Sequence, residues 1–101
     1  MGDIKIFNDI LINGHVYILN WDKLMLVVEK IESIKDSHHG YFGVYISSNT
    51  CTIQGTNFRS DIMQTPSIYF NDIVEDNKIS ATYVAVINFI KWYYKVIKKL
   101  N

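Results

Sequence analysis

The sequence predicts one α+β domain over residues 1–101, with an antiparallel sheet of about five strands and two helices. Residues 80–100 carry a long amphipathic pattern without Gly or Pro, which is typical of a helix that crosses a small domain. Apolar and polar residues alternate over 41–54, as they do in half-buried antiparallel strands. Asn13 and Gly14 stand between two apolar runs, and this pair favours a tight hairpin turn.

The first expected element is therefore a hairpin over Asp9 to Leu19. Glycine adopts the positive φ that such a turn requires at little cost. Both faces of this hairpin would be apolar. That pattern indicates a hairpin buried on both sides, or one that offers a face to a partner.

A helix is expected next, over about Asp22 to Lys35, with Asn20 or Asp22 as its N-cap. Leu24, Val27 and Ile31 recur at helical spacing. A strand over residues 24–28 is the alternative. The mixed Glu and Lys residues that follow favour the helix, because they suit its solvent-exposed side.

The alternating segment predicts a second hairpin that turns at Ser48 and Asn49. Phe42, Val44 and Ile46 share one face of its first arm, and Gly43 indicates either a bulge or a close backbone approach. A connection over 55–66 leads to a last strand near 67–73. The order β-β-α-β-β-β-α predicts one sheet with the helices on one face. The alternative is two small sheets with the final helix between them.

The final helix is expected to begin at Ser80 as N-cap and to provide the centre of the core. The residues predicted to be buried throughout the chain share apolar character and a position on the inner face of an element: Ile10, Val16, Ile18, Leu24, Val27, Ile31, Val44, Ile46, Ile53, Ile68, Phe70, Ile87, Ile90 and Ile97.

The net charge is zero, with ten acidic and ten basic residues, whereas general nucleic-acid binders carry a basic excess. Residues 1–79 hold all ten acids and six bases, a net charge of −4, and residues 80–101 hold four lysines and no acid. The single cysteine excludes an internal disulfide and fits a reducing compartment. With no signal peptide or membrane-spanning run in this sequence, we expect a cytoplasmic location. Secretion without a cleaved signal stays open.

No catalytic, cofactor or metal site is predicted. His15, His38, His39 and Cys51 lack the spacing of a metal site. Cys51 alternates with Ile53 on a predicted strand, which suits a small buried residue better than a nucleophile. We therefore expect a protein without enzymatic activity.

The absence of a catalytic motif, the aromatic content and the acidic body favour a protein-binding module. Its expected role is to neutralise or regulate a larger, basic protein such as a toxin or nuclease, as immunity proteins, antitoxins and phage inhibitors do. The predicted contact residues are exposed aromatic anchors with a polar rim: Tyr41, Tyr45, Phe58, Arg59, Asp61, Tyr69, Asp72, Glu75 and Asp76.

Two alternatives remain from the sequence. In the first, a nucleic acid contacts the basic residues of the last helix, which are Lys91, Lys95, Lys98 and Lys99, while Trp92 and Tyr93 stack on bases. In the second, the chain forms a homodimer or accessory subunit through the apolar hairpin or the Trp92 side of the helix.

Overall fold

The computed structural model describes residues 4–36, 40–55 and 70–97. Within these ranges the chain forms three helices, then four strands, then a long helix that ends in a π-helical turn. In order, these are α1 (Lys5–Ile12), α2 (Gly14–Ile18), α3 (Trp21–Ser33), β1 (Lys35–Asp36), β2 (Gly40–Ser47), β3 (Thr50–Gly55), β4 (Phe70–Val74), α4 (Lys78–Trp92) and the π-helix (Tyr93–Ile97).

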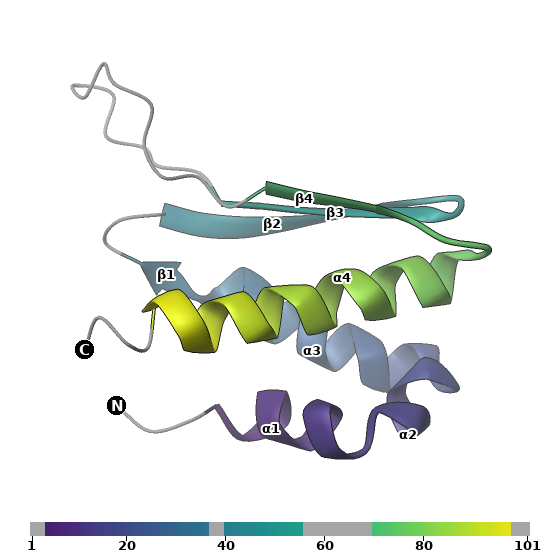
Figure 1. Ribbon diagram of the computed structural model, residues 1–101, viewed down its shortest axis with the longest axis horizontal. Coiled ribbons are helices and arrows are strands. Elements are labelled where there is room, and N and C mark those ends of the chain that lie inside the picture. The colour runs from purple at the N-terminus through teal and green to yellow at the C-terminus, as the bar shows by residue number, and fades with distance from the viewer. Residues whose placement is uncertain (1–3, 37–39, 56–69, 98–101) are drawn as a thin grey trace.

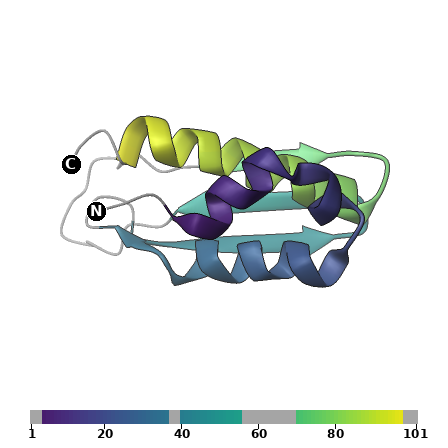
Figure 2. The ribbon, with the colours of Figure 1, turned by 90° about the horizontal axis from the view of Figure 1, so that it is seen from below.

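The elements form three layers (Figure 1). An antiparallel sheet of β2, β3 and β4, to which the two-residue β1 adds at the β2 edge, is the first layer. α3 packs against β2, and α4 packs against β3 and β4. α1 and α2 cover the side of α3 and α4 that faces away from the sheet (Figure 2). The fold is α+β, but the predicted five strands and two helices are wrong, as is the alternative of two sheets around a helix.

The N-terminal hairpin is the largest error, because residues 5–18 are helical. Asn13 is the corner between α1 and α2: its backbone N–H donates to the Asp9 carbonyl at 2.7 Å, and its Nδ2 donates to Asp9 Oδ1 at 2.9 Å. The Tyr17 hydroxyl donates to the other Asp9 carboxylate oxygen. Phe7, Ile10 and Tyr17 are buried. Val16, predicted to be buried, is 37% exposed, because the helical period turns it outward.

Gly14 has a packing role in place of the expected turn role. A Cβ atom at this position would lie 2.0 Å from the hydroxyl oxygen of Tyr83 on α4. Only a residue without a side chain lets the Tyr83 hydroxyl approach the backbone of α2 this closely. Asn13 and Gly14 thus connect α1 to α2, and Gly14 leaves room for Tyr83 of α4.

α3 confirms the predicted first helix and excludes the alternative strand. The side chain of Asn20 accepts a hydrogen bond from the Lys23 backbone N–H at 3.1 Å, so of the two predicted N-cap candidates Asn20 is the N-cap and Asp22 lies in the first turn. Leu24, Val27 and Ile31 are buried on one side of the helix, as predicted. This side packs against β2.

The second hairpin is also confirmed. β2 and β3 pair through Ser47↔Thr50, and the two residues between them make the turn, with Ser48 at a φ of 35°. Phe42, Cys51 and Ile53 are buried against the helices, whereas Val44 and Ile46 are half-buried. β4 overlaps the predicted last strand over residues 70–73. Residues 67–69, including Ile68 of the predicted core, lie outside the described residues, as do the side chains of Phe70 and Ile97.

α4 is confirmed as the organising helix, but it begins earlier and buries a wider surface. Its N-cap is Asn77, whose side chain accepts from the Ser80 N–H at 2.9 Å. The fully buried residues of α4 are Ala81, Thr82, Ala85, Val86, Phe89 and Ile90. This wider buried surface follows from the position of α4 between the sheet and the α1–α2 layer. Ile87, predicted to be buried, is half-buried.

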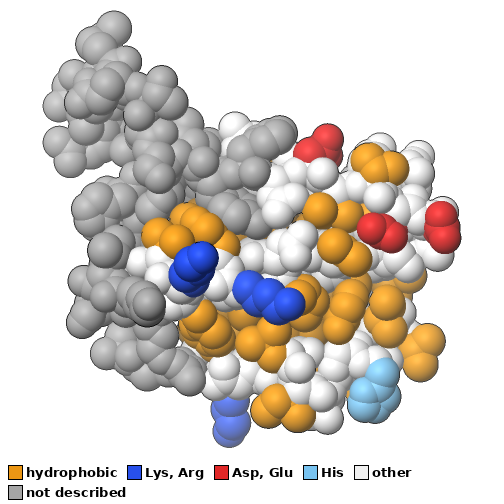
Figure 3. All heavy atoms as spheres, viewed as in Figure 1, with side chains coloured by type: hydrophobic (Ala, Val, Ile, Leu, Met, Phe, Trp, Pro, Cys, Tyr) orange, Lys and Arg blue, Asp and Glu red, His pale blue; other side chains and the backbone are white. Residues whose placement is uncertain are grey.

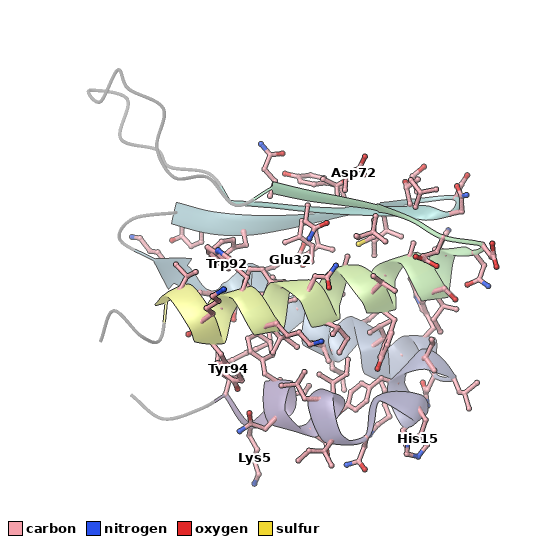
Figure 4. All side chains as sticks on the ribbon, in the orientation of Figure 1. Lys5, His15, Glu32, Asp72, Trp92 and Tyr94 are labelled. Atoms are coloured by element: carbon pink, nitrogen blue, oxygen red, sulfur yellow. The ribbon has the colours of Figure 1, made fainter. Side chains whose placement is uncertain are left out.

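An aromatic cluster joins all three layers near the C-terminal end of α4. The ring of Phe89 lies 4.9 Å from that of Phe42 on β2 and 6.3 Å from that of Phe7 on α1, centroid to centroid. The Tyr94 hydroxyl lies 2.7 Å from Asn8 Oδ1 and 3.3 Å from the Ile4 carbonyl oxygen. The π-helix thereby attaches the end of α4 to the start of α1 (Figure 4).

Candidate functional site

The outer face of the sheet is the candidate interaction surface. All described helices lie on the other side of the sheet (Figure 1). We define the outer face by the residues whose side chains alternate with the buried ones: Tyr41, Gly43, Tyr45, Ser47, Thr50, Thr52, Gln54, Asp72 and Val74. It holds large exposed apolar side chains: Tyr41 is 46% exposed, Tyr45 60% and Val74 61%.

The strand register aligns an aromatic, a hydroxyl and an acid in one row on the outer face. Tyr45 is paired with Thr52, and Thr52 with Asp72. The Thr52 hydroxyl donates to Asp72 Oδ1 at 2.7 Å. Figure 4 shows Asp72 on the side of the sheet away from the helices. Tyr45 and Asp72, which the sequence predicted as contact residues, therefore lie on either side of Thr52, which the prediction did not include.

Gly43 gives the Tyr45 side chain its position. A Cβ atom on Gly43 would lie 2.5 Å from the Tyr45 hydroxyl oxygen and 2.9 Å from a carbon of its ring. The ring thus lies over the Gly43 backbone, which confirms the close approach predicted at this glycine. An aromatic side chain held in this way loses little conformational entropy on binding a partner.

Acidic residues gather where β4 turns into α4. The Glu75 N–H donates to the Asn49 carbonyl at 3.0 Å, and Asn49 Nδ2 donates to the Glu75 carbonyl at 3.0 Å. These bonds attach the turn to the end of the β2–β3 hairpin and leave the side chains of Glu75 and Asp76 exposed. In Figure 3 acidic side chains lie over β4 and this turn, and lysines lie over α4. The fold thus separates acidic residues from exposed Lys91 and Lys95.

Part of the predicted site lies in the described structure. Tyr41, Tyr45 and Asp72 share the outer face, and Glu75 and Asp76 lie at its end. Phe58, Arg59, Asp61 and Tyr69 lie outside the described residues. The sequence prediction missed Thr52 and Val74. For Thr52 the signal was its alternation with Cys51 and Ile53, which puts it on the face of Tyr45.

The aromatic residues beside the helix lysines are half-buried and pack against the core. Trp92 packs at 5.8 Å from the Phe42 ring and 5.7 Å from the Phe89 ring. Tyr93 stacks on Phe89 at 6.1 Å. These contacts cover part of each ring, whereas base stacking uses an open aromatic face. Lys98 and Lys99 lie outside the described residues. The apolar hairpin suggested as a dimer surface does not form, because its residues are helical.

Cys51 is a buried thiol on the inner face of β3. Burial raises its pKa to about 11, although the hydrogen bond with Thr82 opposes the rise. The thiolate, which is the nucleophilic form, is therefore scarcely populated at neutral pH. His15 is exposed on α2, and His38 and His39 lie outside the described residues. Within the described ranges no three His, Cys, Asp or Glu side chains group as a metal site.

A variant without the Cys51 thiol is expected to lose less stability than the wild type as the pH rises into the alkaline range. The unfolded thiol ionises near its ordinary pKa of 9.0 and the folded one near 11, so stability falls as the pH rises between these values. Two pKa units correspond to about 2–3 kcal/mol. Urea unfolding from pH 8 to 11 should show a shallower decline for Cys51→Ala than for the wild type.

Tyr17 is the internal reference for that measurement, because its pKa is also raised, to about 12, by burial and by its bond to Asp9. It contributes the same alkaline decline to both proteins. Cys51→Ala also loses packing at every pH, so only the difference in slope is informative. Parallel curves for the two proteins would contradict the assignment.

No family model matches the chain, and no curated protein or solved structure matches it either. In residues 4–36, 40–55 and 70–97, no helix has the length and apolar character needed to cross a bilayer. The function is therefore inferred from the outer face of the sheet and the charges at its end.

Proposed function

We propose that the chain is a small cytoplasmic binding module that neutralises or regulates a larger protein, in the manner of an immunity protein or a phage-type inhibitor. The observation that carries this proposal is the outer face itself. It presents Tyr45 and Tyr41 as large exposed anchors, and Tyr45 lies in one row with Thr52 and Asp72. Interface energy is concentrated in such aromatic side chains, and a polar rim surrounds them.

The partner's surface is expected to be basic, as on a nuclease or a toxin that contacts nucleic acid. Asp72, Glu75 and Asp76 are exposed on β4 and on the turn that follows it, so they would steer a basic surface toward this end of the sheet. The protein is proposed to act by binding alone. The buried Cys51 thiol with its raised pKa supports this, because such a thiol is a poor nucleophile.

Affinity capture from the host lysate followed by mass spectrometry tests the proposal, with variants to locate the surface. Tyr45→Ala is expected to weaken capture of a specific partner at least about tenfold, the size of a binding hot spot. Leu26→Ala is the matched control, because Leu26 is 53% exposed on α3, in the layer beneath the sheet. A partner lost equally with both variants, or with neither, contradicts the assigned surface.

Charge reversal tests the electrostatic part. Lysine at positions 72, 75 and 76 should slow association with a basic partner and flatten its salt dependence. Association rates measured at low and physiological salt provide the readout. An unchanged rate at low salt would show that the acids do not steer the partner.

A further inference from the structure

The exposed edge of β4 has its own hydrogen-bonding capacity. β4 is the last strand in the order β1-β2-β3-β4. The Glu75 N–H bonds to the Asn49 carbonyl, which makes Asn49 and Glu75 a hydrogen-bonded pair of the ladder. Bonded and non-bonded pairs alternate in antiparallel sheets, so Thr50↔Val74 and Thr52↔Asp72 are non-bonded pairs.

The backbone N–H and C=O groups of Asp72 and Val74 therefore point away from β3. Among the described residues, no group forms a backbone bond with them on that side. The sequence of β4, FNDIV, contains no Pro or Lys, and its register with β3 has no bulge. Exposed strands are commonly protected from added strands by these features. This edge lacks these three, and its one charged side chain is that of Asp72.

We propose that an extended basic segment of the partner adds to this edge as a further strand. This rests on the proposed function and names the binding mode and the chemistry of the segment. Strand addition gains affinity from main-chain hydrogen bonds and specificity from alternate side chains. The bonds would form at Asp72 and Val74, the two residues whose backbone groups face outward.

The outer face indicates the side chains that this segment should carry. A strand beside β4 continues the row Tyr45–Thr52–Asp72, with its own side chain about 5 Å from that of Asp72. Thr52 occupies Asp72 Oδ1, and no described residue bonds to the second oxygen. A Lys or Arg opposite Asp72 would pair with it. Val74, 61% exposed, would meet an apolar residue.

Charge argues against a second copy of this chain as the added strand. Residues 70–77 contain Asp72, Glu75 and Asp76 and no basic residue, and Lys78 follows at the start of α4. Two such edges side by side would bring three acids from each chain together, and like charges across strands are destabilising. A basic segment has the opposite effect, so it is the occupant that fits the edge.

Amide hydrogen exchange, measured by NMR with a probe peptide, tests the proposal on the whole chain. The probe is a capped hexapeptide of alternating valine and lysine, and its control has glutamate in place of lysine. The lysine peptide should slow exchange at the Asp72 and Val74 amides at least about tenfold. The Asn71 and Ile73 amides, already bonded to β3, should change little. No protection at 72 and 74 at millimolar peptide overturns the proposal.

Substitution of Val74 separates the backbone contribution from the side-chain contribution. Val74→Pro removes an N–H that points outward, so the β3–β4 ladder stays intact, and proline is tolerated at such edge positions. It should weaken binding of the lysine peptide at least about tenfold, because one hydrogen bond is lost and the proline ring blocks the approach of the peptide. Val74→Ala keeps the N–H and should bind more tightly than the proline variant. Equal binding by the two variants overturns strand addition.

The outcomes distinguish this inference from the function on which it rests. Partner capture that depends on Tyr45 but leaves the 72 and 74 amides unprotected would keep the binding module and reject the added strand. Protection that appears without peptide and grows with protein concentration would identify a second copy as the occupant, and would overturn the basic segment. If Val74→Pro does not fold, the exchange pattern of the wild type still decides.

Discussion

A chain that ends at Asn77 is expected to show no cooperative thermal transition. The truncation removes α4, which contacts the strands β3 and β4 and the helices α1, α2 and α3. Val86, Phe89 and Ile90 are each completely buried, and burial of three such side chains contributes roughly 5–9 kcal/mol. That equals much of the roughly 5–15 kcal/mol by which a domain of this size is stable.

Circular dichroism and amide dispersion measure the loss, and an add-back experiment is the control. A peptide of residues 78–101, mixed with the truncated chain, should restore a cooperative melt in proportion to its concentration. A sharp melt of residues 1–77 alone would show that the sheet and the first three helices form a core without α4, contrary to the packing observed here.

Phe89→Ala is expected to be the most damaging single substitution on α4, at about 3–5 kcal/mol. The Phe89 ring contacts Phe7, Phe42 and Tyr93, so the cavity would open between all three layers. Rigid neighbours from a helix and a strand cannot all move to fill it. Favourable ring pairs, worth about 0.5–1.5 kcal/mol each, are lost as well.

Denaturant unfolding measures the free energy of unfolding of Phe89→Ala, and two further variants serve as comparisons. Phe89→Leu keeps most of the apolar volume, so it should lose less than half as much stability as Phe89→Ala. Lys91→Ala lies on the same helix but is exposed, and it should change stability by less than about 0.5 kcal/mol. A Phe89→Ala effect as small as that of Lys91→Ala would contradict the three-layer core.

Elements with a strong single period could be predicted from the sequence. The N-cap at Asn20 and the spacing of Leu24, Val27 and Ile31 specify α3. The β2–β3 hairpin was predictable because Cys51 and Ile53 alternate with threonines, which fits a strand and not a helix. In both cases local chemistry and tertiary packing favour the same conformation.

The N-terminal segment could not be assigned in this way, because its apolar residues fit two periods. Phe7 and Ile10 lie three apart and share a helix face, while Ile10 and Ile12 alternate as in a strand. The Asn-Gly pair then favoured a hairpin. The structure instead uses Asn13 to bond back to Asp9 and Gly14 to receive Tyr83, and the second contact comes from α4, far away in the sequence.

The candidate site was predictable as residues but not as a surface. Exposed tyrosines and acids can be proposed from composition and alternation. The row that joins Tyr45 to Asp72 depends on the register of three strands, and the β3–β4 register is set by tertiary contacts across a long connection. Val74 lies on an edge strand because β4 is the last strand of the sheet. The order of strands in a sheet cannot be read from a local sequence pattern.

The bond from Tyr94 to Asn8 has a consequence for folding during synthesis. The two residues are 86 positions apart. At ribosomal rates of about 5–20 residues per second, roughly 4–17 s pass between their synthesis. During that interval Phe7 on α1 lacks its ring contacts with Phe89, Tyr93 and Tyr94. A chain that formed α1 before α4 was made would therefore leave the Phe7 side of that helix uncovered until α4 docks.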